Sequence, residues 1–172
     1  NPDISWDFLM GMFLSVFKRK RWIESLHVID QKLISDSTLF SNVDNTYPHV
    51  KIFAYAFSQS KAYYQADPLL VALRGEREWD NLYNYIEIVR IPEVLDLYKK
   101  RGMPLLRYLY CKNYALRNFA SYWIKILFYK GETGIKYINF KKHIFNNLIF
   151  PNVYLSFFYF IFRKISKFQL LN

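Results

Sequence analysis

FLMGMFLSVFKRKRW, residues 8–22, is the stretch on which the fold prediction rests. Its apolar, aromatic run from Phe8 to Lys18 predicts a buried strand, and the basic residues after it lead into a helix that extends through Leu33. Two more short strands are predicted at 62–66 and 69–73, with a turn between them. Strands and helices that follow one another in this way predict an α+β fold that is rich in helix.

Helices are predicted elsewhere because apolar residues recur every three or four positions. Asn45 or Thr46 is expected to cap one helix, which tolerates Pro48 in its first turn. Another is expected to end near Pro92, and the next to close at Gly102. The predicted helices cover residues 48–57, 79–91, 92–100, 104–129 and 140–168.

Charge divides the chain of 172 residues into two parts. Residues 1–100 carry 12 basic and 13 acidic groups, whereas residues 101–172 carry 12 basic groups and one acidic residue, Glu132. We therefore predict a domain over 1–100 and a helical, basic and aromatic segment over 101–172. An apolar content of 52% excludes a disordered chain, and a single cysteine, Cys111, excludes a disulfide framework.

Most sequence motifs of self-contained catalytic sites are missing. The chain has no G-x-G-x-x-G, no P-loop, no G-x-S-x-G, no H-E-x-x-H and no D-x-D. Cys111 lies among leucines and tyrosines, which predicts a buried, inert thiol. His27 and His143 have no second ligand at metal-binding spacing. No metal site is therefore predicted from the residues of this chain.

One candidate site lies where a helix is expected to begin, in the sequence Asp44-Asn-Thr-Tyr-Pro-His49. A carboxylate and an imidazole stand there beside backbone N–H groups that favour anions. A histidine with an ordinary pKa near about 6.5 suits proton removal at neutral pH. The alternative is a first-turn histidine whose ring is simply solvated.

A second candidate site is the loop Arg74-Gly-Glu76-Arg77-Glu-Trp79. Two guanidinium groups match the oxygens of a phosphate or diphosphate, and the tryptophan offers a face for a sugar or a base. The alternative is a solvated charged turn followed by a tryptophan that belongs to the core.

The order of these motifs resembles the C-terminal half of bacterial family 2 glycosyltransferases of the abequosyltransferase-like kind. The resemblance covers about residues 4–100, and four stretches carry it in sequence. They are Gly11 to Trp22, Tyr47-Pro48-His49, Ala62 to Val71, and Arg74 to Trp79.

The resemblance implies the acceptor-side half of a GT-A, Rossmann-like domain that transfers a sugar from a nucleotide-sugar with inversion. The acceptor is then a glycan or a lipid-linked glycan of cell-surface polysaccharide synthesis, such as O-antigen. It also implies a divalent metal, Mg²⁺ or Mn²⁺, held by a D-x-D in a donor half that this chain lacks. We therefore expect a fragment, or a protein whose remainder is encoded separately.

The resemblance also assigns site residues. His49 stands near the usual acidic pair of the family, so it is the expected catalytic base, with Asp44 as the alternative base or as the group that orients the imidazole. We expect the substrate to approach Gly11 closely and to contact the loop of the second candidate site. These substrate-binding residues are Gly11, Arg74, Glu76, Arg77 and Trp79.

The basic, aromatic segment 101–172 is predicted either to bind an anionic membrane surface or to pack on the domain. No transmembrane helix is predicted, because the longest uncharged run, 143–162, contains Asn and Pro residues. The expected location is the cytoplasm, at the inner face of the cell membrane. Nucleic acid is a disfavoured partner, since no recognisable binding motif occurs. The alternative to an enzyme is an inactive remnant or a basic membrane- or nucleic-acid-binding subunit.

Overall fold

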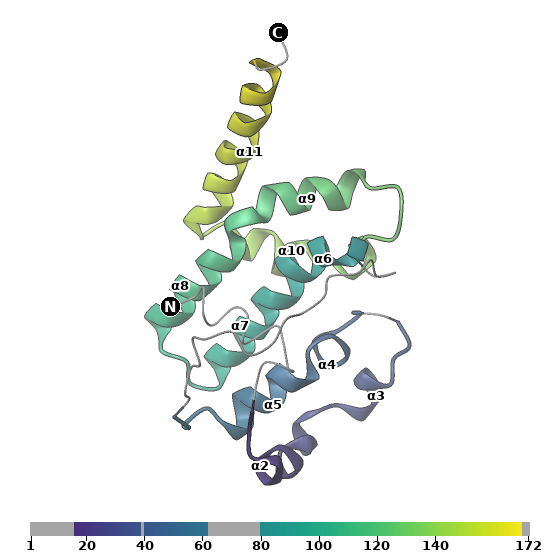
Figure 1. The fold of residues 1–172 in the computed structure, drawn as a ribbon, viewed down its shortest axis with the longest axis vertical. Coiled ribbons are helices and arrows are strands. Elements are labelled where there is room, and N and C mark those ends of the chain that lie inside the picture. The colour runs from purple at the N-terminus through teal and green to yellow at the C-terminus, as the bar shows by residue number, and fades with distance from the viewer. Residues whose placement is uncertain (1–15, 39, 62–79, 170–172) are drawn as a thin grey trace.

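The computed structural model describes residues 16–38, 40–61 and 80–169, and these residues form helices and turns without a strand (Figure 1). The predicted strands at 62–66 and 69–73, and most of the first one, lie outside the described residues. A Rossmann-like half requires parallel strands covered by helices. In the described chain the helices instead pack directly on one another, so the predicted α+β fold with a GT-A half is wrong. A short apolar run does not distinguish a strand from a buried helix.

The predicted first helix is divided into three short ones. Its basic residues form the first turn of α2, as expected, and none of the three helices buries a side chain. The chain starts again at α3 because the Asp30 carboxylate accepts hydrogen bonds from the N–H groups of Lys32 (2.9 Å) and Leu33 (3.4 Å). Aspartate at this position favours a new helix start. The three helices are α2 (Arg19–Glu24), the 3₁₀ turn η2 (Leu26–Val28) and α3 (Gln31–Ile34).

Two helices, α4 (Val43–Thr46) and α5 (Pro48–Ala56), meet at Tyr47. Asn42 caps α4, and it exchanges side chain to backbone hydrogen bonds of 3.0 and 3.2 Å with Asn45. The predicted cap of α5 by Asn45 or Thr46 is therefore wrong, because both residues belong to α4. Pro48 begins α5 as expected. The predicted buried face of α5 is confirmed at Val50, Phe53 and Ala54.

A continuous helical stretch runs from residue 80 to residue 100, so the predicted end at Pro92 is wrong. A π turn precedes the proline, and it already departs from the regular α-helical hydrogen-bond pattern. The stretch closes as predicted at Gly102, whose φ of +97° is the left-handed conformation that favours glycine. Its elements are η3 (Asp80–Leu82), α6 (Tyr83–Tyr85), the π turn η4 (Ile86–Arg90) and α7 (Ile91–Lys100).

The C-terminal part of the chain completes the core. Its helices are α8 (Leu105–Ala115), η5 (Leu116–Asn118), α9 (Phe119–Phe128), η6 (Ile135–Tyr137), α10 (Phe140–His143), η7 (Phe145–Asn147) and α11 (Pro151–Gln169). The core lies where α7, α8, α9 and the start of α11 meet, and it includes residues from both sides of position 100. Its most deeply buried large side chains include Tyr85, Ile88, Leu116 and Phe119.

One close approach in this core requires a glycine. Gly134 has a φ of +72°, and it lies directly on the ring of Tyr85, which is fully buried. A Cβ on Gly134 would lie only 2.7 Å from the Cγ atom of that ring. The turn before η6 therefore packs on the core because this residue has no side chain.

Candidate functional site

Asp44 lies in α4 and is 3% exposed. Lys51, one turn into α5, donates to both carboxylate oxygens of Asp44, at 2.8 and 2.7 Å. The backbone N–H of Asp30 donates to Oδ2 at 2.8 Å. The carboxylate of Asp44 thus links the starts of α3, α4 and α5, so the Asp44–Lys51 ion pair has a structural role.

His49 is the second residue of α5, and it is 8% exposed. Its ring lies edge-on between two aromatic rings, with its centroid 5.9 Å from that of Tyr47 and 6.1 Å from that of Phe53. The histidine is therefore held by packing in the first turn of a nine-residue helix, and the predicted solvated ring is not what the structure shows. Asp44 is engaged by Lys51, which makes the carboxylate a structural group rather than a free proton acceptor.

The remaining predicted site residues cannot be placed around His49. Gly11, Arg74, Glu76, Arg77 and Trp79 all lie outside the described residues. In the parts of the chain that the structure describes, no group of three or more His, Cys, Asp or Glu side chains is arranged to hold a metal ion. The divalent metal that the resemblance implies therefore does not fit the described residues.

Glu87 is an acidic residue near this region that the sequence did not single out. It lies in the π turn η4, and burial raises the pKa of its carboxyl above the usual range, against the opposing charge of Arg117. Burial likewise raises the pKa of Tyr47, the neighbour of His49, and the charge of Glu87 adds to this increase. A buried carboxyl with a raised pKa is a candidate functional group, and Glu87 lies close enough to Tyr47 to affect the pKa of that tyrosine.

A second cluster that sequence reasoning missed surrounds Glu93 in α7. Its carboxylate accepts from Arg90 on the preceding turn and from Lys142 and His143 on α10. Burial opposes the ionisation of Glu93, but the hydrogen bond from His143, the charge of Arg90 and the hydrogen bond from Lys142 outweigh it and lower the pKa to about 2. His143 Nδ1 accepts from the N–H of Asn139 at 3.0 Å, so the ring proton lies on Nε2, which faces Glu93 at 3.0 Å.

Arg90 extends this cluster to the N-terminal part of the chain. Its Nε donates to the carbonyl of Phe40 at 3.0 Å, and another of its nitrogens donates to the carbonyl of Ser41. Only the Arg90 and Glu93 pair could have been found from sequence, through its i,i+3 spacing on a helix. The partners in this cluster come from η4, α7, α10 and the Phe40–Ser41 segment, so the arrangement holds these parts of the chain together.

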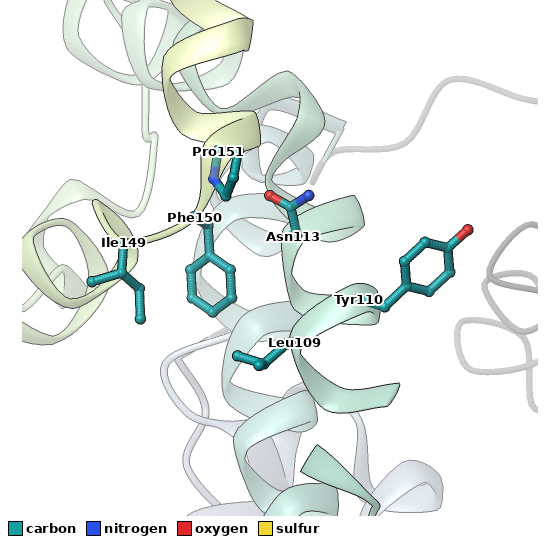
Figure 2. Close-up of a pocket in the computed structure, with 6 residues that line it drawn as sticks. All are labelled: Leu109, Tyr110, Asn113, Ile149, Phe150 and Pro151. Atoms are coloured by element: carbon teal, nitrogen blue, oxygen red, sulfur yellow. The ribbon is translucent and has the colours of Figure 1, made fainter. Parts of the chain in front are cut away.

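A shallow pocket of about 330 Å³ lies between α8 and the start of α11 (Figure 2). Its lining is mostly apolar, and among its residues only Tyr110 carries an ionisable group. The amide oxygen of Asn113 is engaged, because it accepts from the N–H of Asn152 at 2.9 Å. The pocket therefore lacks an acid–base pair. The lining residues are Leu109, Tyr110, Asn113, Ile149, Phe150 and Pro151.

The other titratable side chains named from sequence have local roles. Cys111 is half-buried rather than buried as predicted, and this partial burial raises the pKa of its thiol, with the charge of Arg107 opposing it, which agrees with the inert part of the prediction. The Nδ1 atom of His27 lies 2.8 Å from the carbonyl of Glu24, and its ring packs edge-on against Tyr55. Neither residue lies in a cluster of metal-binding groups.

In the comparisons with known proteins, no family model, no curated protein and no solved structure matches the chain.

Proposed function

We propose that the chain is part of a sugar transferase of cell-surface polysaccharide synthesis, which moves a sugar from a nucleotide-sugar to a glycan or lipid-linked acceptor. The helical fold of the described residues lends no support to a GT-A domain. The proposal rests on the order of the sequence motifs and on one structural observation. That observation is the position of His49, packed between two rings in the first turn of α5.

The proposed chemistry is a single displacement at the anomeric carbon. His49 accepts the proton of the acceptor hydroxyl while the oxygen of that hydroxyl forms the new glycosidic bond. The bond from the anomeric carbon to the diphosphate breaks, and the nucleoside diphosphate leaves with the electron pair. Arg74 and Arg77, on the loop that the resemblance assigns to the donor, are proposed to stabilise the charge of this leaving group.

The test uses cells that carry the gene in its natural context. Their membranes are incubated with radiolabelled nucleotide-sugars, and label that enters the butanol-extractable lipid or the polymeric glycan is counted. We expect His49→Ala and His49→Gln to lower transfer by about 10²- to 10⁴-fold, the usual contribution of a general base. His27→Ala, at an exposed histidine on η2, is the matched control and is expected to leave transfer unchanged.

Two results would contradict the proposal. Transfer at the wild-type rate by both His49 variants would remove His49 from the chemistry and leave the binding-subunit alternative. Unchanged surface polysaccharide after deletion of the gene would remove the polysaccharide assignment itself. Immunoblots and far-UV circular dichroism of the variants establish that each one is present and helical.

A further inference from the structure

Among the described residues, the hydrogen bonds and the ring contact that attach the last helix, α11, to α8 and α9 lie near its start. Asn152 exchanges two hydrogen bonds with Asn113 of α8, at 2.9 and 2.8 Å. The Ser156 hydroxyl accepts from the backbone N–H of Ala120 at 3.0 Å, and Phe157 packs on Phe119 with ring centroids 6.4 Å apart. Beyond this anchor the helix extends away from the other helices (Figure 1).

The side of α11 that faces away from the anchor is apolar from Tyr154 to Ile165. Val153 and Ser156 on the anchored side are 1% and 5% exposed, whereas Phe158 and Phe162 on the opposite side are 71% and 75% exposed. These positions recur every three or four residues, as one stripe of a helix requires. We name this surface the α11 apolar face, and it consists of Tyr154, Leu155, Phe158, Ile161, Phe162 and Ile165.

Positive charge accompanies this face. Arg163 and Lys164 are exposed and lie about a quarter to a half turn of the helix away from Phe162, on the side of the anchor. The helix contains no Asp or Glu, and the segment 101–172 contains one acidic residue, Glu132. Arg163 therefore lies at the edge of the apolar face and Lys164 lies on the anchored side, and the helix itself supplies no acidic partner for either cation.

We infer that α11 binds an anionic lipid bilayer by lying in its surface plane, with the α11 apolar face among the acyl chains near the headgroups. The helix of 19 residues is about 28 Å long at 1.5 Å per residue, enough to place several aromatic side chains at headgroup depth. Arg163, at the edge of the face, then reaches the anionic headgroups, Lys164 adds to the positive charge near the surface, and the anchored side keeps the rest of the protein in water.

Two observations favour a lipid surface over a second copy of the chain. At about 100° per residue, the α11 apolar face and the exposed Tyr159 beside it together cover about 160° of the helix circumference. This is broader than the narrow seam of a two-stranded coiled coil. The exclusively positive charge of α11 also complements anionic headgroups, whereas a second α11 offers no acidic side chain to pair with it.

The helix is not proposed to cross the membrane. Among the described residues, no single helix has the length and apolar character of a membrane span. One pair, Phe140–Asn147 and Pro151–Ser166, meets those criteria together, but the two helices are bent by 85°. The hydrogen bonds of Asn152 to Asn113 and of Ala120 to Ser156 fix the start of α11 on α8 and α9.

The test measures flotation of the purified chain with vesicles, and it requires no transferase activity. Vesicles of phosphatidylcholine with about one-third phosphatidylglycerol are compared with vesicles of phosphatidylcholine alone, at low and high salt. We expect the chain to float with the anionic vesicles and to be released by salt. Phe158→Gln together with Phe162→Gln is expected to lower the partition coefficient by about 30-fold.

Two matched controls distinguish binding by this face from nonspecific binding of vesicles by other exposed apolar or basic side chains. Phe128→Gln removes a phenylalanine of similar exposure from the end of α9, and it is expected to leave flotation unchanged. Arg163→Gln with Lys164→Gln is expected to lower partitioning by about 30-fold, whereas neutralising Lys20 and Lys32 at the N-terminal helices is expected to change it little.

The inference is overturned if the wild-type chain does not float, or if the α11 and control variants float equally. It is also overturned if light scattering shows a dimer that the Phe158 and Phe162 substitutions dissociate without any vesicle binding, because a second copy then covers the face. If the chain does not bind vesicles but shifts RNA or DNA in a gel in a way that depends on Arg163 and Lys164, nucleic acid rather than lipid is the partner of these cations.

Discussion

Replacing Glu93 with glutamine tests whether the buried charge cluster stabilises the helical core. The carboxylate of Glu93 is 9% exposed and faces Arg90, Lys142 and His143. Glutamine has nearly the same shape, so Glu93→Gln removes the negative charge and leaves the packing intact. The guanidinium of Arg90, only 5% exposed, then lacks its buried counter-ion.

The expected loss is about 3 kcal/mol of unfolding free energy. Removing one partner of a buried ion pair costs about 3–5 kcal/mol, because the other charge stays buried without compensation. Arg90 keeps its hydrogen bonds to the carbonyls of Phe40 and Ser41, which places the loss at the lower end. The pKa of Glu93, lowered from 4.5 to about 2, agrees, since each pKa unit corresponds to about 1.4 kcal/mol.

The same shift predicts how stability depends on pH. The folded-state pKa lies below the unfolded-state value, so Glu93 stabilises the fold above about pH 4.5. This contribution is lost as the pH falls from about 4.5 to about 2, where the carboxylate becomes protonated in the folded protein as well. Glu93→Gln is expected to lack this part of the pH dependence.

Urea unfolding followed by far-UV circular dichroism measures both the loss of unfolding free energy in Glu93→Gln and its dependence on pH. In thermal unfolding at pH 7, a loss of about 3 kcal/mol lowers the melting temperature by about 6–12 °C in a chain of this length. The control is Glu132→Gln, which breaks an exposed pair with Lys136 at 2.9 Å and is expected to cost under about 1 kcal/mol. Equal, small losses for Glu93→Gln and Glu132→Gln would refute the reasoning.

Two further stability predictions concern single contacts. Gly134→Ala places a Cβ 2.7 Å from the Tyr85 ring at a left-handed φ, so thermal unfolding is expected to show a loss of about 2–4 kcal/mol. Gly102→Ala, with a left-handed φ but no atom within 4 Å, is expected to lose about 1–2 kcal/mol, and equal losses would contradict the ring contact. Asp44→Asn is expected to cost about 2–3 kcal/mol in urea unfolding, because Lys51 loses its counter-ion. A double-mutant cycle with Lys51→Met should give a coupling above about 1 kcal/mol, and a coupling near zero would contradict the ion pair.

Local sequence patterns predicted the parts of the fold that local interactions determine. The helical spacing from Val50 to Phe53 correctly predicted the buried face of α5, and Gly102 correctly marked the end of α7. Pro151 marks a break within the helical candidate 140–168, and it begins α11, as prolines at first helical positions do. Each of these features depends on residues within a few positions of one another.

The errors arose where distant residues decide the structure. The predicted α+β fold was wrong, because the apolar runs on which it rested do not distinguish strands from buried helices. Pro92 was predicted to end a helix, because nothing in the sequence indicates the π turn before it. Glu93 was not selected as a functional or structural residue, since its partner His143 is 50 residues away in the chain.

The candidate site was predicted only in part. The sequence placed Asp44 and His49 at the start of one helix, and the structure puts both at the junction of α4 and α5. It could not show that Lys51 binds Asp44, because an i,i+7 pair across a break between helices has no recognisable pattern. The sequence also did not single out Glu87 as a residue near the candidate site, because the raised pKa of its carboxyl comes from burial by distant elements.

The two long-range connections of the Arg90 and Glu93 cluster also bear on the order of folding. Arg90 reaches back 50 residues to Phe40, and Glu93 reaches forward 50 residues to His143. Each connection closes a long loop, so neither can form before chain segments far apart have met. We expect both connections to form after the rate-limiting step, and interactions of this kind slow unfolding without accelerating folding. Glu93→Gln should therefore increase the unfolding rate and leave the refolding rate nearly unchanged, a division that stopped-flow measurements in urea resolve directly.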